Sequence, residues 1–135
     1  ASSKTIVITG GETLTWDMTR LTGALKAKGC DIHIETSGAY KLTGQWDWIC
    51  LSPKKIKLPT EEIYPLAHEL KVIIFNKHDF KFAEEQAEKV SENCILYLQP
   101  EWSNRDKMMP LIVDFVMKHP KWKVSLQTHK YLNIP

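Results

Sequence analysis

The sequence predicts an α/β fold built on a mostly parallel sheet. Short apolar runs alternate with segments of helical periodicity, and Gly, Pro or Ser residues mark where the runs end. Strands that alternate with helices imply right-handed crossovers and therefore parallel pairing. A length of 135 residues with 43% apolar and 25% charged side chains is that of one globular domain, so we expect residues 1–135 to form a single domain.

The first half of the chain predicts three strands and one helix. Strands are expected at residues 4–9, 31–36 and 48–51, and the first is apolar and β-branched, as in strands buried on both faces. A helix is expected at 14–28, with Gly29 as its left-handed C-cap. The apolar residues at helical spacing in this segment are Leu14, Met18, Leu21 and Leu25.

The second half predicts strands at 69–75, 95–99 and 122–126. Between them we expect a helical turn within 61–67, kept short by Pro65. One helix is expected from Asp79, its N-cap, to about residue 90, and another from Asn104 or Asp106 to 118. The residues of this last helix expected to face inward are Met108, Leu111, Ile112, Phe115 and Val116.

Composition excludes several classes of protein. A net charge of +2 is too small to indicate nucleic-acid binding. No apolar run reaches the roughly 18 residues of a membrane span, and no signal segment opens the chain. Cys30, Cys50 and Cys94 form no C-x-x-C pair, and we expect them to be buried, reduced thiols in a cytoplasmic protein.

Polar clusters stand at five predicted strand ends, where ligands of parallel sheets bind. Five such ends at one rim favour a binding site there, although loops are often polar without any function. The clusters are Thr9-Gly10-Gly11-Glu12, Glu35-Thr36-Ser37, Ser52-Pro53-Lys54, Gln99-Pro100-Glu101 and Gln127-Thr128-His129.

The turn Gly10-Gly11-Glu12 suits a ligand that carries both a carboxylate and an ammonium group. The glycines let the backbone approach a ligand, their amides can donate to an anion, and Glu12 can accept from a cation. A tight turn with a capping glutamate is the alternative. The spacing of a phosphate-binding Walker loop, of a zinc site and of a serine-hydrolase elbow is missing.

Several motifs together resemble the 7-carboxy-7-deazaguanine synthase family of radical S-adenosylmethionine enzymes, and the resemblance extends from Ile6 to Pro135. The first turn is similar to the Gly-Gly-Glu-Pro element of radical S-adenosylmethionine enzymes, and residues 125–135 are similar to this family's C-terminal signature. The remaining motifs are His33-Ile34-Glu35-Thr36-Ser37-Gly38, Leu51-Ser52-Pro53-Lys54, Glu69-Leu70-Lys71 and Tyr97-Leu98-Gln99-Pro100.

The resemblance implies a fold and an activity. The fold would be a partial, compact radical-SAM (β/α) barrel. In the family, a reduced 4Fe-4S cluster cleaves S-adenosylmethionine, and the 5′-deoxyadenosyl radical takes hydrogen from 6-carboxytetrahydropterin. A magnesium-assisted ring contraction then gives 7-carboxy-7-deazaguanine for queuosine biosynthesis. The resemblance also implies a homodimer.

The resemblance assigns site residues by position. Thr9, His129 and the terminal carboxylate of Pro135 would contact the pterin. The S-adenosylmethionine contacts would be Gly11, Glu12, Ser37, Ser52, Pro53, Lys54 and Gln99.

Two departures from the family pattern affect what is expected of this chain. Thr13 stands where the family has proline, which loosens the turn but keeps its amides. The N-terminal segment that supplies the three cluster cysteines and a magnesium-binding threonine is missing, and Cys30, Cys50 and Cys94 have the wrong spacing to replace them. We therefore expect the C-terminal portion of such an enzyme, inactive alone, with no catalytic or metal-ligating residue assigned in this chain.

Two other interpretations remain open from the sequence. One is a non-catalytic ligand-binding or dimerisation module of the same fold. The other is an unrelated α/β enzyme that uses Glu12, Glu35 and Glu101 as acid–base groups.

Overall fold

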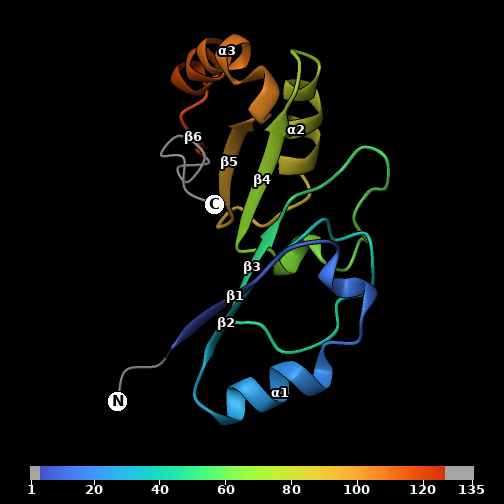
Figure 1. The fold of residues 1–135 in the computed structure, drawn as a ribbon. Helices are drawn as coiled ribbons and strands as arrows, with labels where there is room; N and C mark the ends of the chain where they lie inside the picture. Colours follow the sequence, from blue (N-terminus) through green and yellow to red (C-terminus); the bar gives the residue numbers. More distant parts are fainter. Residues whose placement is uncertain (1–3, 127–135) are drawn as a thin grey trace.

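The computed structural model describes residues 4–126 as a six-stranded sheet whose strands are all parallel and follow one another in chain order (Figure 1). This confirms the predicted α/β class. Right-handed crossovers between strands in chain order keep the connecting helices on one side of a sheet, as in a (β/α) barrel. The strands are β1 (Thr5–Ile8), β2 (Asp31–Thr36), β3 (Trp48–Leu51), β4 (Glu69–Ile74), β5 (Ile95–Pro100) and β6 (Trp122–Val124).

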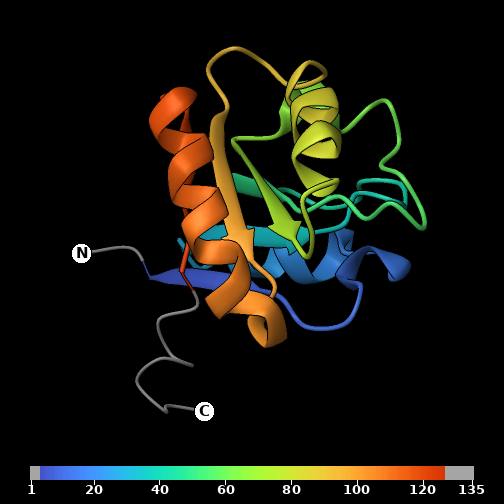
Figure 2. The same ribbon diagram turned by 90° about the horizontal axis from the view of Figure 1, so that it is seen from above.

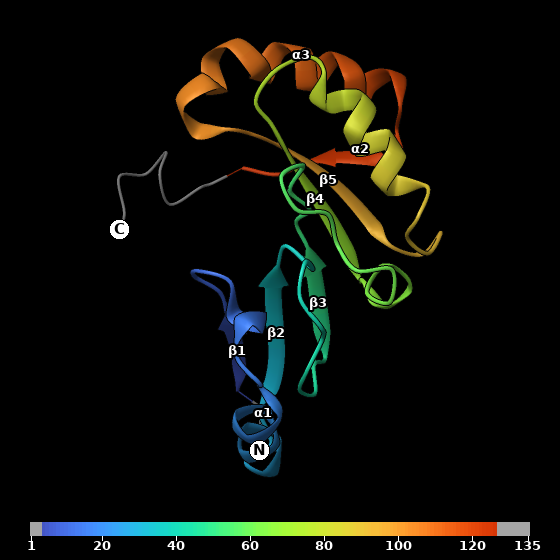
Figure 3. The same cartoon turned by 90° about the vertical axis from the view of Figure 1, so that its right-hand side faces the viewer.

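Three α-helices pack against the sheet. Helix α1 (Thr19–Ala27) contacts β2, α2 (Asp79–Ala87) contacts β4, and α3 (Arg105–Lys118) contacts β5 and β6. Figure 2 shows α3 running alongside β5, and Figure 3 shows α2 and α3 at one end of the sheet and α1 at the other. Within residues 4–126, no helix has the length and apolarity to cross a bilayer.

The core lies on the side of the sheet that the helices cover. Alternate strand residues such as Ile34, Leu51, Val72 and Leu98 are at most 1% exposed there. The residues between them point to the opposite side, which we call the open face. It carries mainly polar or charged side chains, including His33, Glu35, Lys71 and Gln99.

The strand predictions hold, with one correction. The strands at 31–36 and 48–51 have the predicted bounds, and the others differ by one or two residues. The prediction that the first strand is buried on both faces is wrong, because Val7 is 59% exposed. Strand β1 pairs only with β2 among the described strands, and its residues alternate between partly buried and exposed.

The first helix begins later than predicted. Residues Thr13–Thr15 form a short 3₁₀ helix, η1, and α1 starts only at Thr19, where the Asp17 carboxylate accepts the Thr19 N–H. Leu14 and Met18 are buried as the spacing suggested, but Leu21 is 49% exposed. Gly29, with φ +79°, ends the helix in the predicted left-handed conformation.

The later helices also correct individual predictions. Asp79 does not cap α2, because its carboxylate accepts the N–H groups of Phe75 and Asn76 before the helix and pairs with Lys55. Helix α2 also ends at Ala87, short of the predicted residue 90. Two 3₁₀ turns, η2 (Tyr64–Leu66) and η3 (Trp102–Asn104), precede β4 and α3.

Helix α3 starts directly after η3. Asn104 lies at its N-cap without a side-chain cap bond, and Asp106 lies within the first turn. Met108 and Ile112 are buried, and Phe115 and Val116 pack partly against the core, as predicted. Leu111 is 44% exposed, so its expected inward position is wrong.

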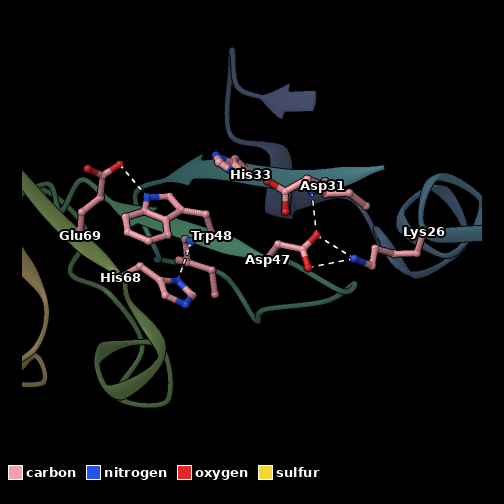
Figure 4. Close-up of polar contacts among 9 residues, drawn as sticks. Lys26, Asp31, His33, Asp47, Trp48, His68 and Glu69 are labelled. Carbon is pink, nitrogen blue, oxygen red and sulfur yellow. Dashed lines mark hydrogen bonds and ion pairs between the residues drawn. The ribbon is translucent and has the colours of Figure 1, made fainter. Parts of the chain in front are cut away.

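A polar cluster ties together the amino ends of β2, β3 and β4 (Figure 4). Lys26 pairs with Asp47 at 2.8 Å, and Asp47 also accepts the backbone N–H of Ile32. Trp48 stacks on His68 and donates its indole N–H to Glu69. Chemistry in parallel barrels takes place at the opposite, carboxyl ends, so this cluster serves stability.

Candidate functional site

A pocket of about 340 Å³ opens at the carboxyl ends of β1, β2 and β3. We call it the rim pocket. It brings together three of the five polar clusters that the sequence places at strand ends. Its lining residues are Thr9, Gly10, Gly11, Glu12, Glu35, Thr36, Ser37, Ser52 and Lys54.

A second pocket of about 260 Å³, the inner pocket, adjoins it toward β4 and β5. The two pockets share Glu35, Ser52 and Lys54. The other lining residues of the inner pocket are Lys71, Ile73, Gln99, Pro100, Glu101 and Trp102. A fourth strand-end cluster, Gln99-Pro100-Glu101, therefore faces the same continuous space.

The two glycines of the first turn have different roles. Gly10 has φ +99°, a conformation that favours glycine, whereas Gly11 has no left-handed φ. A Cβ built at either position meets nothing within 4 Å. Both line the rim pocket. The turn thus needs glycine at Gly10, and Gly11 leaves its space open to a ligand.

The carboxylate of Glu12 joins the end of β1 to the end of β2. One oxygen accepts the Leu14 N–H at 3.0 Å and the Thr36 hydroxyl at 2.7 Å; the other accepts the backbone N–H and the hydroxyl of Ser37 at 2.9 and 2.7 Å. Burial disfavours the charged form, but the bonds from Ser37, Leu14 and Thr36 outweigh it and lower the pKa of Glu12. Glu12 caps η1 and fixes Ser37 at the pocket.

The segment Ser52-Pro53-Lys54 follows β3 directly. Ser52 is 5% exposed and donates its N–H to the Thr36 carbonyl at 2.8 Å, which anchors the start of the loop. The Lys54 ammonium donates to the Ser52 hydroxyl at 3.4 Å, a long contact. Partial burial of this ammonium lowers the pKa of Lys54, and the neighbouring Glu35 opposes the shift.

Gln99 lies at the far wall of the inner pocket. It is 4% exposed, and its side-chain oxygen accepts the Ser125 hydroxyl at 3.1 Å. The next residue along the rim, Glu101, accepts the Asn104 N–H and the Ser103 hydroxyl and so caps η3. His129 and Pro135 lie outside the described residues.

Glu35 and Lys71 line the inner pocket, although neither is among the ligand contacts that the resemblance assigns. They lie on the open face of β2 and β4, and the Lys71 ammonium contacts the Glu35 carboxylate at 2.7 Å. Both stand in motifs noted from the sequence, and strand alternation could have placed them on the polar face. Their pairing could not be foreseen, because 36 positions separate them.

The three cysteines are dispersed through the fold. Cys30, Cys50 and Cys94 are buried, free thiols. Burial raises the pKa of Cys50 and raises the pKa of Cys94 to about 11, which disfavours the thiolate that metals bind. Between residues 4 and 126, no three His, Cys, Asp or Glu side chains gather as a metal site. The thiols therefore do not fit an iron–sulfur cluster.

The acid–base interpretation finds little support in the geometry. Glu12 is enclosed by four donors, Glu35 is paired with Lys71, and Glu101 caps η3. Each carboxylate of that trio is engaged by neighbouring groups. The arrangement instead suits binding: an open glycine turn, a lysine and polar strand ends around one space.

Curated relatives are similar to nearly the whole chain. This chain is 71% identical over 133 residues to "7-carboxy-7-deazaguanine synthase" of Flavobacterium psychrophilum, and the match covers 98% of this chain and 63% of that protein. The protein of the same name from Synechocystis sp. is 54% identical, covering 96% and 62%. That of Prochlorococcus marinus is 35% identical, covering 96% and 67%. The chain thus spans about three fifths of the length of the first two relatives.

Among solved structures, the crystal structure of QueE from Escherichia coli superposes with a TM-score of 0.81 at 25% identity. The superposition covers 94% of this chain and 58% of that one. The chain matches no protein-family model.

The parallel sheet in chain order, with its two pockets at the carboxyl ends of the strands, defines a partial α/β barrel of the radical-SAM type. Within that class the chain belongs to the 7-carboxy-7-deazaguanine synthase family.

Proposed function

We propose that the full-length gene product converts 6-carboxy-5,6,7,8-tetrahydropterin to 7-carboxy-7-deazaguanine with S-adenosylmethionine, as a carbon–nitrogen lyase of queuosine biosynthesis. The observation that carries the proposal is the convergence of family motifs on one space. The turn after β1 and the ends of β2 and β3 line the rim pocket, and the end of β5 lines the adjoining inner pocket.

S-adenosylmethionine fits the rim on chemical grounds. Its amino-acid end needs donors for a carboxylate and an acceptor for an ammonium group. The Lys54 ammonium can donate to the carboxylate, and the space beside Gly11 gives the ligand room. The Ser37 hydroxyl donates its proton to Glu12, so its oxygen can accept from the ligand ammonium, and Glu12 supplies negative charge. We assign Ser52 to the wall that holds the ligand and Gln99 to its far end. Pro53 lines neither pocket, and its contact with the ligand remains a prediction from family resemblance.

The pterin is assigned to the neighbouring part of the rim. Thr9 lines the rim pocket beside the glycine turn, which supports its assignment to substrate. His129 and the carboxylate of Pro135 remain predictions from family resemblance. A terminal carboxylate can accept hydrogen bonds from the amino-pyrimidine edge of a pterin.

The 4Fe-4S cluster and magnesium of the family are part of this proposal for the full-length protein. Because Cys30, Cys50 and Cys94 do not fit a cluster site, we assign its ligands to sequence other than these 135 residues. We include a cytoplasmic location and a homodimer in the proposal on family resemblance alone. No membrane or nucleic-acid partner is proposed.

The test is the pair of glycine variants in the full-length gene product. Gly11→Val should weaken S-adenosylmethionine at least ten-fold, measured by anaerobic titration calorimetry, because the side chain fills the ligand's space. Folding should be unaffected, since that space is empty of protein. Gly23→Val is the matched control: Gly23 also lacks a left-handed φ, and a Cβ built there meets nothing within 4 Å outside its own helix backbone. Gly23 lies in α1 and lines neither pocket, so this variant should leave S-adenosylmethionine affinity close to wild type.

Turnover of the pterin by wild type, followed by mass detection of the deazapurine product, completes the test. Failure of the wild-type protein to bind S-adenosylmethionine or to form that product would refute the proposed function. Unchanged affinity in Gly11→Val would remove Gly11 from the site and leave the activity to be judged by turnover.

A further inference from the structure

The floor of the inner pocket holds one carboxylate between two lysines. Glu35 and Lys71 are in contact at 2.7 Å, with side-chain exposures of 38% and 16%. Lys54 lines both pockets together with Glu35. Glu35 and Lys71 both influence the charge of Lys54, Glu35 by favouring it and Lys71 by opposing it. The three groups therefore form one electrostatic unit.

The ammonium groups of the two lysines differ in their hydrogen-bond and ion-pair partners. Lys71 is largely buried and its charge is matched by Glu35. Lys54 has a long contact to the Ser52 hydroxyl, and no carboxylate within residues 4–126 lies within 4.0 Å of its ammonium. Among the described residues, the pocket thus presents one lysine paired with a carboxylate, Lys71, and one without a close carboxylate, Lys54.

We propose that Lys71 is a positioning residue: by holding Glu35 it keeps the Lys54 ammonium available for the carboxylate of S-adenosylmethionine. This inference rests on the proposed function. Lys71 lines the inner pocket, but in this proposal it acts through Glu35, by removing a competitor for Lys54.

The physical reason is a competition between anions. A carboxylate fixed in the same pocket competes for Lys54 as an intramolecular partner, with a high effective concentration. Without Lys71, the Glu35 carboxylate would sit partly buried without its cation, and the closest remaining compensation in the pocket is Lys54. An internal Glu35–Lys54 pair would then have to break before the ligand carboxylate could bind.

The test is a double-mutant cycle in the full-length gene product, read by S-adenosylmethionine affinity in anaerobic titration calorimetry. Lys71→Met should raise the dissociation constant about ten-fold, the cost of roughly one charge-assisted contact. Lys71→Arg should stay close to wild type, because it retains the charge that holds Glu35. Adding Glu35→Gln to Lys71→Met should restore most of the lost affinity, because the competitor is gone.

Lys26→Met provides the matched control. Lys26 makes an ion pair of nearly the same length, 2.8 Å to Asp47, in the cluster at the amino ends of the strands. Its loss should lower stability and leave S-adenosylmethionine affinity within two-fold of wild type.

Restoration by the second substitution separates positioning from a structural role. If the effects of Lys71→Met and Glu35→Gln are both harmful and additive, Lys71 is structural and the inference is wrong; unchanged affinity in Lys71→Met also overturns it. These outcomes presuppose that the wild type binds S-adenosylmethionine. If it does not, the proposed function itself fails, and the two failures are told apart by that single measurement.

Discussion

The Glu12 carboxylate organises the rim pocket, and its hydrogen-bond acceptor positions are all occupied by neighbouring donors. A carboxylate offers about four acceptor positions, and here Leu14, Thr36 and Ser37 supply four donors. A ligand ammonium at Glu12 would have to share an oxygen with Ser37. Glu12 therefore serves first to hold the glycine turn against the end of β2. Its negative charge also contributes to the electrostatic potential of the rim pocket.

The contribution of Glu12 to stability should depend on pH. Its pKa is lowered in the folded protein, so its stabilisation is present above the unfolded-state pKa and is lost as pH falls through the folded-state value. Glu12→Gln should cost about 1–2 kcal/mol at pH 7, because an amide cannot accept from four donors. Urea unfolding of both proteins at pH 7 and near pH 3 checks this, and a difference that does not shrink in acid would contradict it.

The loop after β2 depends on Gly38 in two ways. Its φ is +73°, and a Cβ there would lie 2.5 Å from the Leu51 side chain and 3.2 Å from Pro59. Its carbonyl also accepts the Thr60 N–H. The turn that carries Ser37 is thus packed directly against the core and against the segment after the Lys54 loop.

Gly38→Ala and Gly29→Ala form a pair that separates backbone strain from crowding. Gly29 has a similar φ of +79°, but a Cβ there meets nothing within 4 Å. Gly29→Ala should therefore cost only the strain, about 1 kcal/mol, whereas Gly38→Ala adds overpacking and should cost about 2–4 kcal/mol in total. The free energy of unfolding of the two variants measures these costs. Equal losses would show that the Leu51 side chain moves aside without destabilising the protein.

At the scale of the whole molecule, parallel strands in chain order bring four strand-end clusters to one edge. The same topology keeps the thiols apart. Cys30 precedes β2, Cys50 lies within β3 and Cys94 precedes β5, each buried. The chain thus carries two adjoining pockets at the carboxyl ends of its strands and three thiols unsuited to a shared metal centre.

Anaerobic reconstitution with iron and sulfide should therefore give no stoichiometric 4Fe-4S cluster on these 135 residues. No 5′-deoxyadenosine should form from S-adenosylmethionine after reduction, whereas the full-length gene product should give both. Iron analysis and electron paramagnetic resonance check the cluster, and chromatography checks the nucleoside. A cluster signal together with 5′-deoxyadenosine from the 135 residues alone would overturn this account.

The sequence by itself determined the strands, their order along the chain and the residues at their carboxyl ends. Periodicity of apolar residues and the glycines after them are local signals, and the strands at 31–36 and 48–51 were predicted with their bounds. The family motifs also placed Gly11, Glu12, Ser52 and Lys54, all of which line the rim pocket. The roles proposed for them remain predictions.

Only the tertiary structure decided which side chains form hydrogen bonds and ion pairs with one another. Asp79 does not cap α2 as predicted, because its carboxylate accepts the Phe75 N–H and pairs with Lys55, a partner 24 positions away that local propensity does not specify. Glu35 on β2 and Lys71 on β4 can reach each other because their strands flank β3 in the sheet. The two residues are 36 positions apart in the sequence, so no local pattern predicts their contact. Such bonds depend on which distant segments the fold brings side by side, and that is decided by the packing of the whole sheet.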